Sequence, residues 1–116
     1  MSLQYIQQLG PLISAVLGLL AIVSPATTEK FVSVKGEGKL GNAEIRATYG
    51  GFFLGIALYA LTTQADAAFW ALGFGWLSAA AVRFFTLFFG FYSPKNVGGV
   101  VFEASIGVLC LVGFGS

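Results

Sequence analysis

Hydrophobic residues along the chain are concentrated in four long runs, which are separated by shorter polar segments. A run of roughly 20 apolar residues has the length of a helix that crosses a lipid bilayer. The pattern therefore predicts an all-α fold, an integral membrane bundle of four antiparallel helices in up-and-down order. The whole chain, residues 1–116, is expected to form a single transmembrane domain. The predicted helices cover residues 6–23, 43–63, 67–92 and 97–114.

The polar segments between the runs predict how successive helices are connected. Residues 26–42 are polar and rich in glycine, and we interpret them as a loop with a short strand over 30–35. Residues 64–66 and 93–96 leave room only for tight turns. Helices joined by such short connections are expected to be antiparallel neighbours.

Composition supports a membrane protein and argues against several classes of function. Hydrophobic residues make up 57% of the chain and charged residues 9%, whereas ordinary soluble domains carry roughly 25% charged residues. The net charge is +1 and no basic tract is present, so a nucleic-acid partner is not expected. The chain has no histidine and one cysteine, Cys110, and therefore no metal site, cofactor or redox pair is expected. The first ten residues contain no Lys or Arg, so the first apolar run is interpreted as a retained helix rather than a cleaved signal.

The lysines in the predicted connections indicate an orientation in the membrane. Lys30, Lys35 and Lys39 lie between the first two runs, and Lys95 lies between the last two. The positive-inside rule places these connections in the cytoplasm. Both termini of this multi-pass protein are then extracytoplasmic, and a bacterial inner membrane is the expected location.

Four ionisable residues fall inside or at the edge of the predicted spans: Glu44, Arg46, Arg83 and Glu103. A charge at the centre of a bilayer costs roughly 2.5–3.5 kcal/mol on insertion scales, so such residues usually face a partner or a watery cavity. At a rise of about 1.5 Å per residue, Arg83 and Glu103 lie about 13 Å and about 9 Å from the cytoplasmic ends of their helices. All four charges are thus expected in one half of the bilayer, in a common polar layer.

Two interpretations of this layer remain open. In the structural one, Arg83 and Glu103 form a buried ion pair, while Glu44 and Arg46 stabilise a helix end. In the functional one, Arg46 and Arg83 bind a phosphate or carboxylate, Glu103 neutralises Arg83 when the site is empty, and Tyr49 supplies a hydroxyl. The candidate ligand-binding residues are therefore Arg46, Arg83, Glu103, Glu44 and Tyr49, and the candidate ligand is a small anion or a lipid headgroup.

At these residues the chain resembles a family of bacterial four-helix membrane proteins with DoxX-like architecture. The members of this family share a domain of unknown function. The resemblance rests on the segment 44–51, on Gly55, on Arg83 late in the third helix and on Glu103 early in the fourth. It covers roughly residues 9–113. The resemblance implies the fold and the placement of the charged residues, and it implies no particular reaction, ligand or cofactor.

These observations favour a binding or accessory role toward a membrane lipid or another membrane protein. The alternative is a small transporter or channel, working as a homo-oligomer, for a small anion or a proton-coupled solute. An enzyme is less expected, because Glu44 and Glu103 are the only acids in the spans available for acid–base chemistry. No catalytic residue is assigned.

Overall fold

We analysed the protein in a computed structural model that describes residues 3–32, 37–90 and 92–114. Its described residues form helices and no strands. The elements are α1 Leu3–Gln7, α2 Leu9–Val23, α3 Pro25–Val32, α4 Gly38–Glu44, the π-helix η1 Ile45–Phe52, α5 Phe53–Thr63, α6 Asp66–Thr86 and α7 Pro94–Leu111.

Among the described residues, three helical stretches are long and apolar enough to cross a membrane: Leu3–Val23, Gly38–Thr63 and Asp66–Thr86. The first combines α1 and α2, and the second is a continuous rod of α4, η1 and α5. Helix α7 has 18 residues, but it is not among these three, since Lys95, Asn96 and Glu103 lower its hydropathy. The prediction of an all-helical fold is therefore confirmed for the described residues, and the first three runs have the length and composition of membrane-spanning helices.

Several boundaries differ from those predicted from the sequence: the second helix begins at Gly38 rather than at residue 43, and the fourth covers Pro94–Leu111 rather than 97–114. The third helix ends at Thr86 rather than at residue 92, because the chain turns over residues 87–90 through i→i−3 hydrogen bonds and Gly90 has a φ of +92°. The polar segment 26–42 is largely helical, so the prediction of a strand is wrong for residues 30–32. Residues 33–36 of the predicted strand lie outside the described residues.

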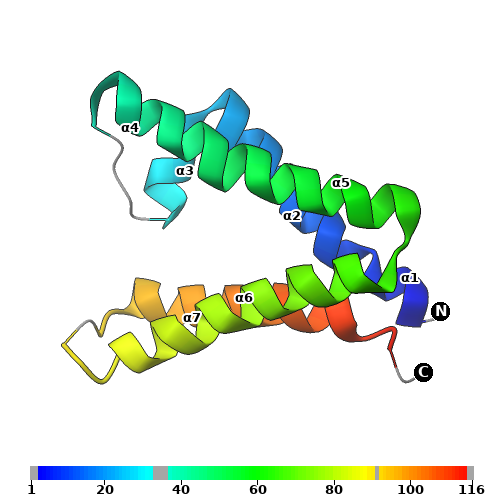
Figure 1. Ribbon diagram of the computed structural model, residues 1–116. Coiled ribbons are helices and arrows are strands. Elements are labelled where there is room, and N and C mark those ends of the chain that lie inside the picture. The colour runs from blue at the N-terminus through cyan, green and yellow to red at the C-terminus, as the bar shows by residue number, and fades with distance from the viewer. Residues whose placement is uncertain (1–2, 33–36, 91, 115–116) are drawn as a thin grey trace.

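The helices form two packed pairs that diverge from each other (Figure 1). The rod of η1 and α5 packs against α2, and α6 packs along α7; α2 also contacts α7 and joins the pairs. Gln64 adopts a left-handed conformation, with a φ of 55°, and reverses the chain between α5 and α6. From this turn the two helices separate toward the end that carries α3 and α4, whereas both termini lie at the opposite end.

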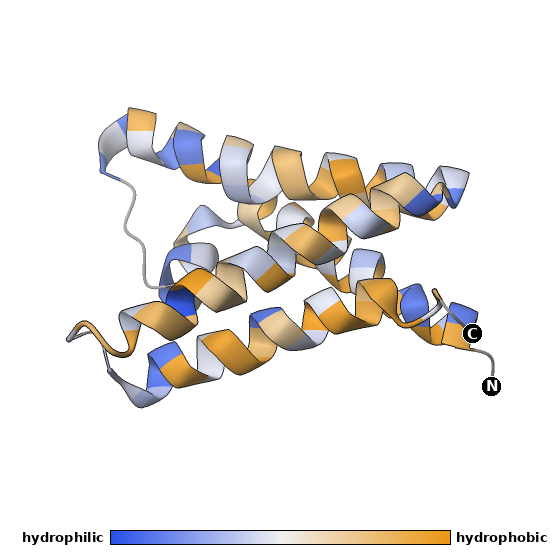
Figure 2. Cartoon of the chain, turned by 60° about the horizontal axis from the view of Figure 1, so that its bottom comes forward, coloured by the Kyte–Doolittle hydropathy of each residue, from blue (hydrophilic) through white to orange (hydrophobic). Residues whose placement is uncertain are grey.

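The interior of the molecule is made of small and aromatic residues, and many large apolar side chains point outward. A central cluster contains Ala15, Ala57, Leu72, Trp76, Ile106 and Cys110. Exposed apolar residues include Val16, Phe74, Phe85 and Val101, and Figure 2 shows that hydrophobic residues occur along the whole length of the long helices. A soluble monomer rarely exposes so much contiguous apolar surface, whereas lipid chains solvate it readily.

Candidate functional site

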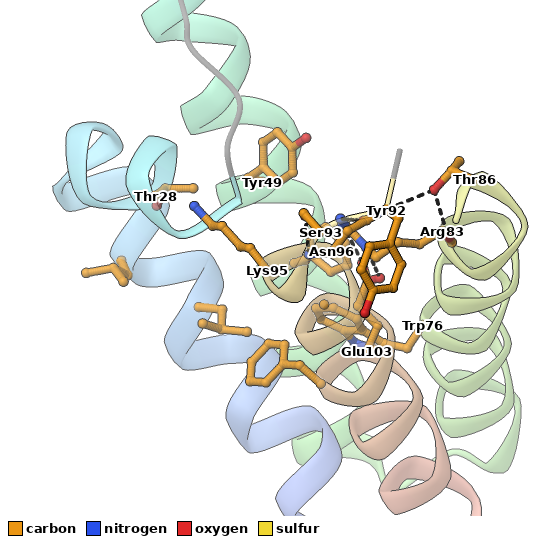
Figure 3. A pocket seen from close by; sticks show the side chains of 15 residues that line it. Thr28, Tyr49, Trp76, Arg83, Thr86, Tyr92, Ser93, Lys95, Asn96 and Glu103 are labelled. Atoms are coloured by element: carbon orange, nitrogen blue, oxygen red, sulfur yellow. Dashed lines mark hydrogen bonds and ion pairs between the residues drawn. The ribbon is translucent and has the colours of Figure 1, made fainter. Parts of the chain in front are cut away.

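A pocket of about 540 Å³ lies between the two helix pairs, where they diverge (Figure 3). Its volume is within the roughly 300–1,000 Å³ range of small-molecule sites in proteins. Helices α2 and α3 and the η1–α5 segment contribute one wall, and α6, α7 and the segment between them contribute the other. The pocket exists because α5 and α6 meet at one end only.

The polar wall of the pocket is built around Arg83 of α6. Its Nε donates to Oε1 of Glu103 at 2.7 Å, and its Nη2 donates to Oε2 at 3.4 Å. Its Nη1 donates to Oδ1 of Asn96 at 3.1 Å. Since Glu103 and Asn96 lie two turns apart on α7, one guanidinium spans both and fixes the register of α6 against α7.

A glycine on α7 makes room for this arginine. A Cβ atom at Gly99 would lie 2.9 Å from Cδ of Arg83, so any larger residue would push the guanidinium away from its partners. Gly99 lies between Asn96 and Glu103 in the sequence. Arg83 therefore crosses α7 at the position where the helix has no side chain.

The network continues toward the end of α6. Nδ2 of Asn96 donates to Oγ1 of Thr86 at 3.1 Å, and Thr86 donates to the carbonyl oxygen of Arg83 at 2.5 Å. The backbone N–H of Asn96 donates to Oγ of Ser93 at 3.0 Å, as in an N-cap. The side chains of Arg83 and Glu103 are 34% and 13% exposed, so the charged groups are held in place and still reach the pocket.

The part of the pocket surface away from Arg83 is apolar and aromatic. The ring centroids of Phe53 and Trp76 are 5.1 Å apart, and those of Trp76 and Phe102 are 6.5 Å apart at 90°. Leu17 and Leu20 of α2 face the same space. The pocket thus joins a charged region on α6 and α7 to an apolar region between α2, α5 and α7.

Trp76 is anchored by a hydrogen bond within the core. Its Nε1 donates to Oγ of the fully buried Ser14 at 2.9 Å, and Ser14 donates to the carbonyl oxygen of Gly10 at 2.9 Å. We expect Ser14→Ala to lower the free energy of unfolding by about 1–3 kcal/mol, because the indole N–H would remain buried without an acceptor. Unfolding followed in mixed detergent measures this loss, and Ser105→Ala on exposed α7 surface is the control, with a change near zero. An unchanged stability in Ser14→Ala would show that Trp76 does not depend on this bond.

Three of the five candidate residues from the sequence lie together. Arg83, Glu103 and Tyr49 all line the pocket. The ion pair considered in the structural interpretation is present, and it also lies at the wall of a cavity, as the functional interpretation requires. The site therefore has the ion pair of the structural interpretation and the cavity of the functional interpretation.

Arg46 and Glu44 do not line this pocket, so the pocket does not bring all five candidate residues together. Nε of Arg46 donates to Oδ1 of Asn42 at 2.8 Å, and its Nη1 donates to the carbonyl oxygen of Ile22 at 2.9 Å. Arg46 thus satisfies the C-terminal end of α2, where a positive charge is favourable. Glu44 is exposed. It does not stabilise a helix start, because the helical rod begins at Gly38 rather than near residue 43.

Sequence analysis missed several polar residues of the pocket, namely Thr28, Thr86, Ser93, Lys95 and Asn96. The segment 93–96 was assigned to a turn, although α7 begins at Pro94. A serine followed by proline is a common start of a helix, with Ser as N-cap and Pro in the first turn. This signal could have extended the fourth helix and placed Asn96 one turn away from Gly99.

A second, more open hollow lies on the outer side of the same ion pair. It is lined by Ser78, Ala79 and Val82 of α6 together with Arg83, Thr86, Asn96 and Glu103. The Arg83–Glu103 pair therefore separates the pocket between the helix pairs from the surface of α6 and α7. In the part of the chain that the structure describes, no group of three or more His, Cys, Asp or Glu residues could hold a metal ion.

Comparisons with known proteins identify no relatives. No family model matches the chain, and no curated protein or solved structure matches it. The resemblance to DoxX-like membrane proteins accordingly stays a prediction, and function has to be argued from the site.

Proposed function

We propose that this protein is a four-helix integral membrane protein that binds a lipid or another amphiphile in the pocket between its helix pairs. The observation that carries the proposal is an ion-paired arginine on the wall of an otherwise apolar pocket of about 540 Å³. Polar groups in such a pocket orient a ligand, and apolar walls contribute most of the binding area. An accessory role, in which the bound lipid or the protein surface serves a membrane partner, belongs to the same proposal.

Helix α7 serves as the fourth span in this proposal. It packs along α6 over most of its length, and its Glu103 is neutralised by Arg83 at 2.7 Å. Pairing removes part of the cost of placing a carboxylate in the membrane. With 18 residues, α7 is at the short end of the range for a transmembrane helix.

The distribution of lysines supports an orientation with both termini outside the cytoplasm. Lys30 on α3 and Lys39 on α4 lie at the end of the molecule opposite the termini, and Lys95 at the start of α7 lies at the same end (Figure 1). The positive-inside rule assigns that end to the cytoplasm. The pocket then opens in the cytoplasmic half of a bacterial inner membrane.

Filling the pocket tests the proposal directly. Leu20 is half-buried and lines the pocket, whereas its neighbour Leu19 is exposed on another face of α2. Native mass spectrometry of the protein released from mild detergent should show a retained amphiphile in the wild type and in Leu19→Trp. Leu20→Trp should lose it, because the indole would occupy the ligand volume. Equal retention by both variants, or no retained molecule in the wild type, would contradict the proposal.

A second candidate function is transport by an oligomer, and one observation favours it. Glu103 and Arg83 line both the pocket and the outer hollow, so a proton or anion could meet the same pair from two sides. Against it, both carboxylate oxygens of Glu103 accept hydrogen bonds from Arg83, so proton uptake would have to break the ion pair. Proteoliposome flux that is abolished by Glu103→Gln would support transport, and flux that survives the substitution would dismiss the carrier role.

A further inference from the structure

We infer that the pocket selects an amphiphile whose headgroup carries one negative charge, and that Lys95 is the residue that confers this selectivity. The ligand class is a phosphodiester or carboxylate headgroup on an apolar tail. This inference rests on the proposed function, because it names the ligand of the same pocket.

Among the described residues that line the pocket, the charges balance to a single cation without an anionic partner. The ionised lining residues are Arg83, Lys95 and Glu103. Arg83 and Glu103 form an ion pair at 2.7 Å and cancel each other. Lys95 donates to the backbone carbonyl oxygen of Lys30 at 2.7 Å, and a carbonyl group carries no net charge. An anion with one charge would therefore neutralise the pocket, and a dianion would leave one charge without a partner.

Hydrogen-bond donors remain after the internal contacts are counted. An ammonium group has three N–H donors and a guanidinium has five. Lys95 uses one donor on Lys30, and Arg83 uses three on Glu103 and Asn96. Both cations can thus donate to headgroup oxygens while their present contacts persist, with Lys95 supplying the charge and Arg83 supplying additional hydrogen bonds.

The pocket also indicates how the ligand lies. Lys95 and Ser93 come from the start of α7, at the end of the molecule opposite the termini, and Lys95 points toward α3 (Figure 3). Phe53, Trp76 and Phe102 form the apolar wall. A headgroup near Lys95 places the tail against Trp76. Since Trp76 is 9% exposed, a probe that reaches it has entered the pocket.

Trp76 can therefore report binding in a single-tryptophan protein. The other tryptophan, Trp70, is 41% exposed and stacks on Phe114, so Trp70→Phe removes its signal and keeps an aromatic ring. The full chain with this substitution is placed in phosphatidylcholine nanodiscs that contain small fractions of lipid brominated on the acyl chain. Brominated phosphatidylglycerol, which is a monoanion, should quench Trp76 at about one tenth of the fraction needed for brominated phosphatidylcholine.

Substitution at Lys95 tests the selectivity. Lys95→Gln should reduce the tenfold preference to about twofold or less, and Lys95→Arg should restore it because the charge returns. Lys39→Gln is the matched control, since Lys39 is an exposed lysine at the same end of the molecule and outside the pocket. An undiminished preference in Lys95→Gln would overturn the role of Lys95. Equal quenching by both lipids in the wild type would overturn the charge selectivity and leave amphiphile binding intact.

Further probes in the same experiment show which kind of anion binds. They also separate an error in the ligand class from a failure of the proposed function. Brominated stearate tests a single-chain carboxylate, and inorganic phosphate is added as a competitor without a tail. Quenching by stearate with the same dependence on Lys95 supports the ligand class. Displacement of the brominated lipid by millimolar phosphate would overturn the requirement for a tail. Absence of quenching by every brominated probe would reject the proposed function itself.

Discussion

Glu103→Ala should lower the free energy of unfolding by about 2–3 kcal/mol, one of the two largest effects expected in this protein. Removing one partner of a buried ion pair typically costs roughly 3–5 kcal/mol, because the other charge remains without compensation. We expect a loss below this range because the Arg83 side chain is 34% exposed. Its guanidinium can turn toward the membrane–water interface when Glu103 is removed. Unfolding in mixtures of dodecyl sulfate and a mild detergent, followed by far-UV circular dichroism, measures the change.

The double variant Arg83→Met/Glu103→Leu is the control for this prediction. Replacing both charges by apolar residues of similar size leaves no unpaired charge, although Oδ1 of Asn96 loses the hydrogen bond from Arg83. Such replacements of an ion pair are often neutral or stabilising. We expect the double variant to recover most of the stability lost in Glu103→Ala and to bind the amphiphile more weakly, because Arg83 no longer donates hydrogen bonds to the headgroup. A double variant as unstable as Glu103→Ala would mean that the pair contributes through packing rather than through charge.

The second large effect is expected where α2 packs against the junction of η1 and α5. A Cβ atom at Gly18 would lie 2.8 Å from the backbone nitrogen of Leu54 and 2.9 Å from the carbonyl oxygen of Gly50. Backbone atoms cannot move aside as a flexible side chain can, so Gly18→Ala must separate the two helices. We expect a loss of about 2–3 kcal/mol, toward the upper end of the range for overpacking, in the same unfolding experiment.

Gly55→Ala provides the matched comparison. A Cβ atom there would meet nothing within 4 Å, and alanine favours a helix over glycine by roughly 0.5–1 kcal/mol. We therefore expect Gly55→Ala to be neutral or slightly stabilising. Equal effects of the two substitutions would contradict the close packing of α2 on η1.

The glycine pattern shows what can and cannot be derived from the sequence. Gly51 and Gly55 form a small-xxx-small motif that favours close helix contact in membranes. In the structure these two glycines are exposed, and Gly18 and Gly50 form the close contact instead. The motif does not reveal which face of a helix meets a partner, because glycine occurs on several faces of this rod.

The long apolar runs and the tight turn at Gln64 were predictable, since span length and connection length follow directly from hydropathy. Arg83 and Glu103 could be paired by counting depth along two antiparallel helices, which needs only the rise per residue. Arg46 could not be placed this way. Its position depends on the helix starting at Gly38 and on the last turn of α2, where Ile22 offers a carbonyl oxygen. Both features depend on how the helices pack, and the order of polar and apolar residues along the chain does not predict them.

The most direct test of the central claim is photolabelling with a diazirine-bearing phosphatidylglycerol in membranes, followed by peptide mapping of the labelled sites. The account predicts labels on the pocket residues Phe53, Trp76 and Phe102, and predicts that excess unlabelled phosphatidylglycerol suppresses these labels more than phosphatidylcholine does. Labels confined to outward residues such as Phe74, Phe85 and Val101, with no difference between the two competitors, would contradict it.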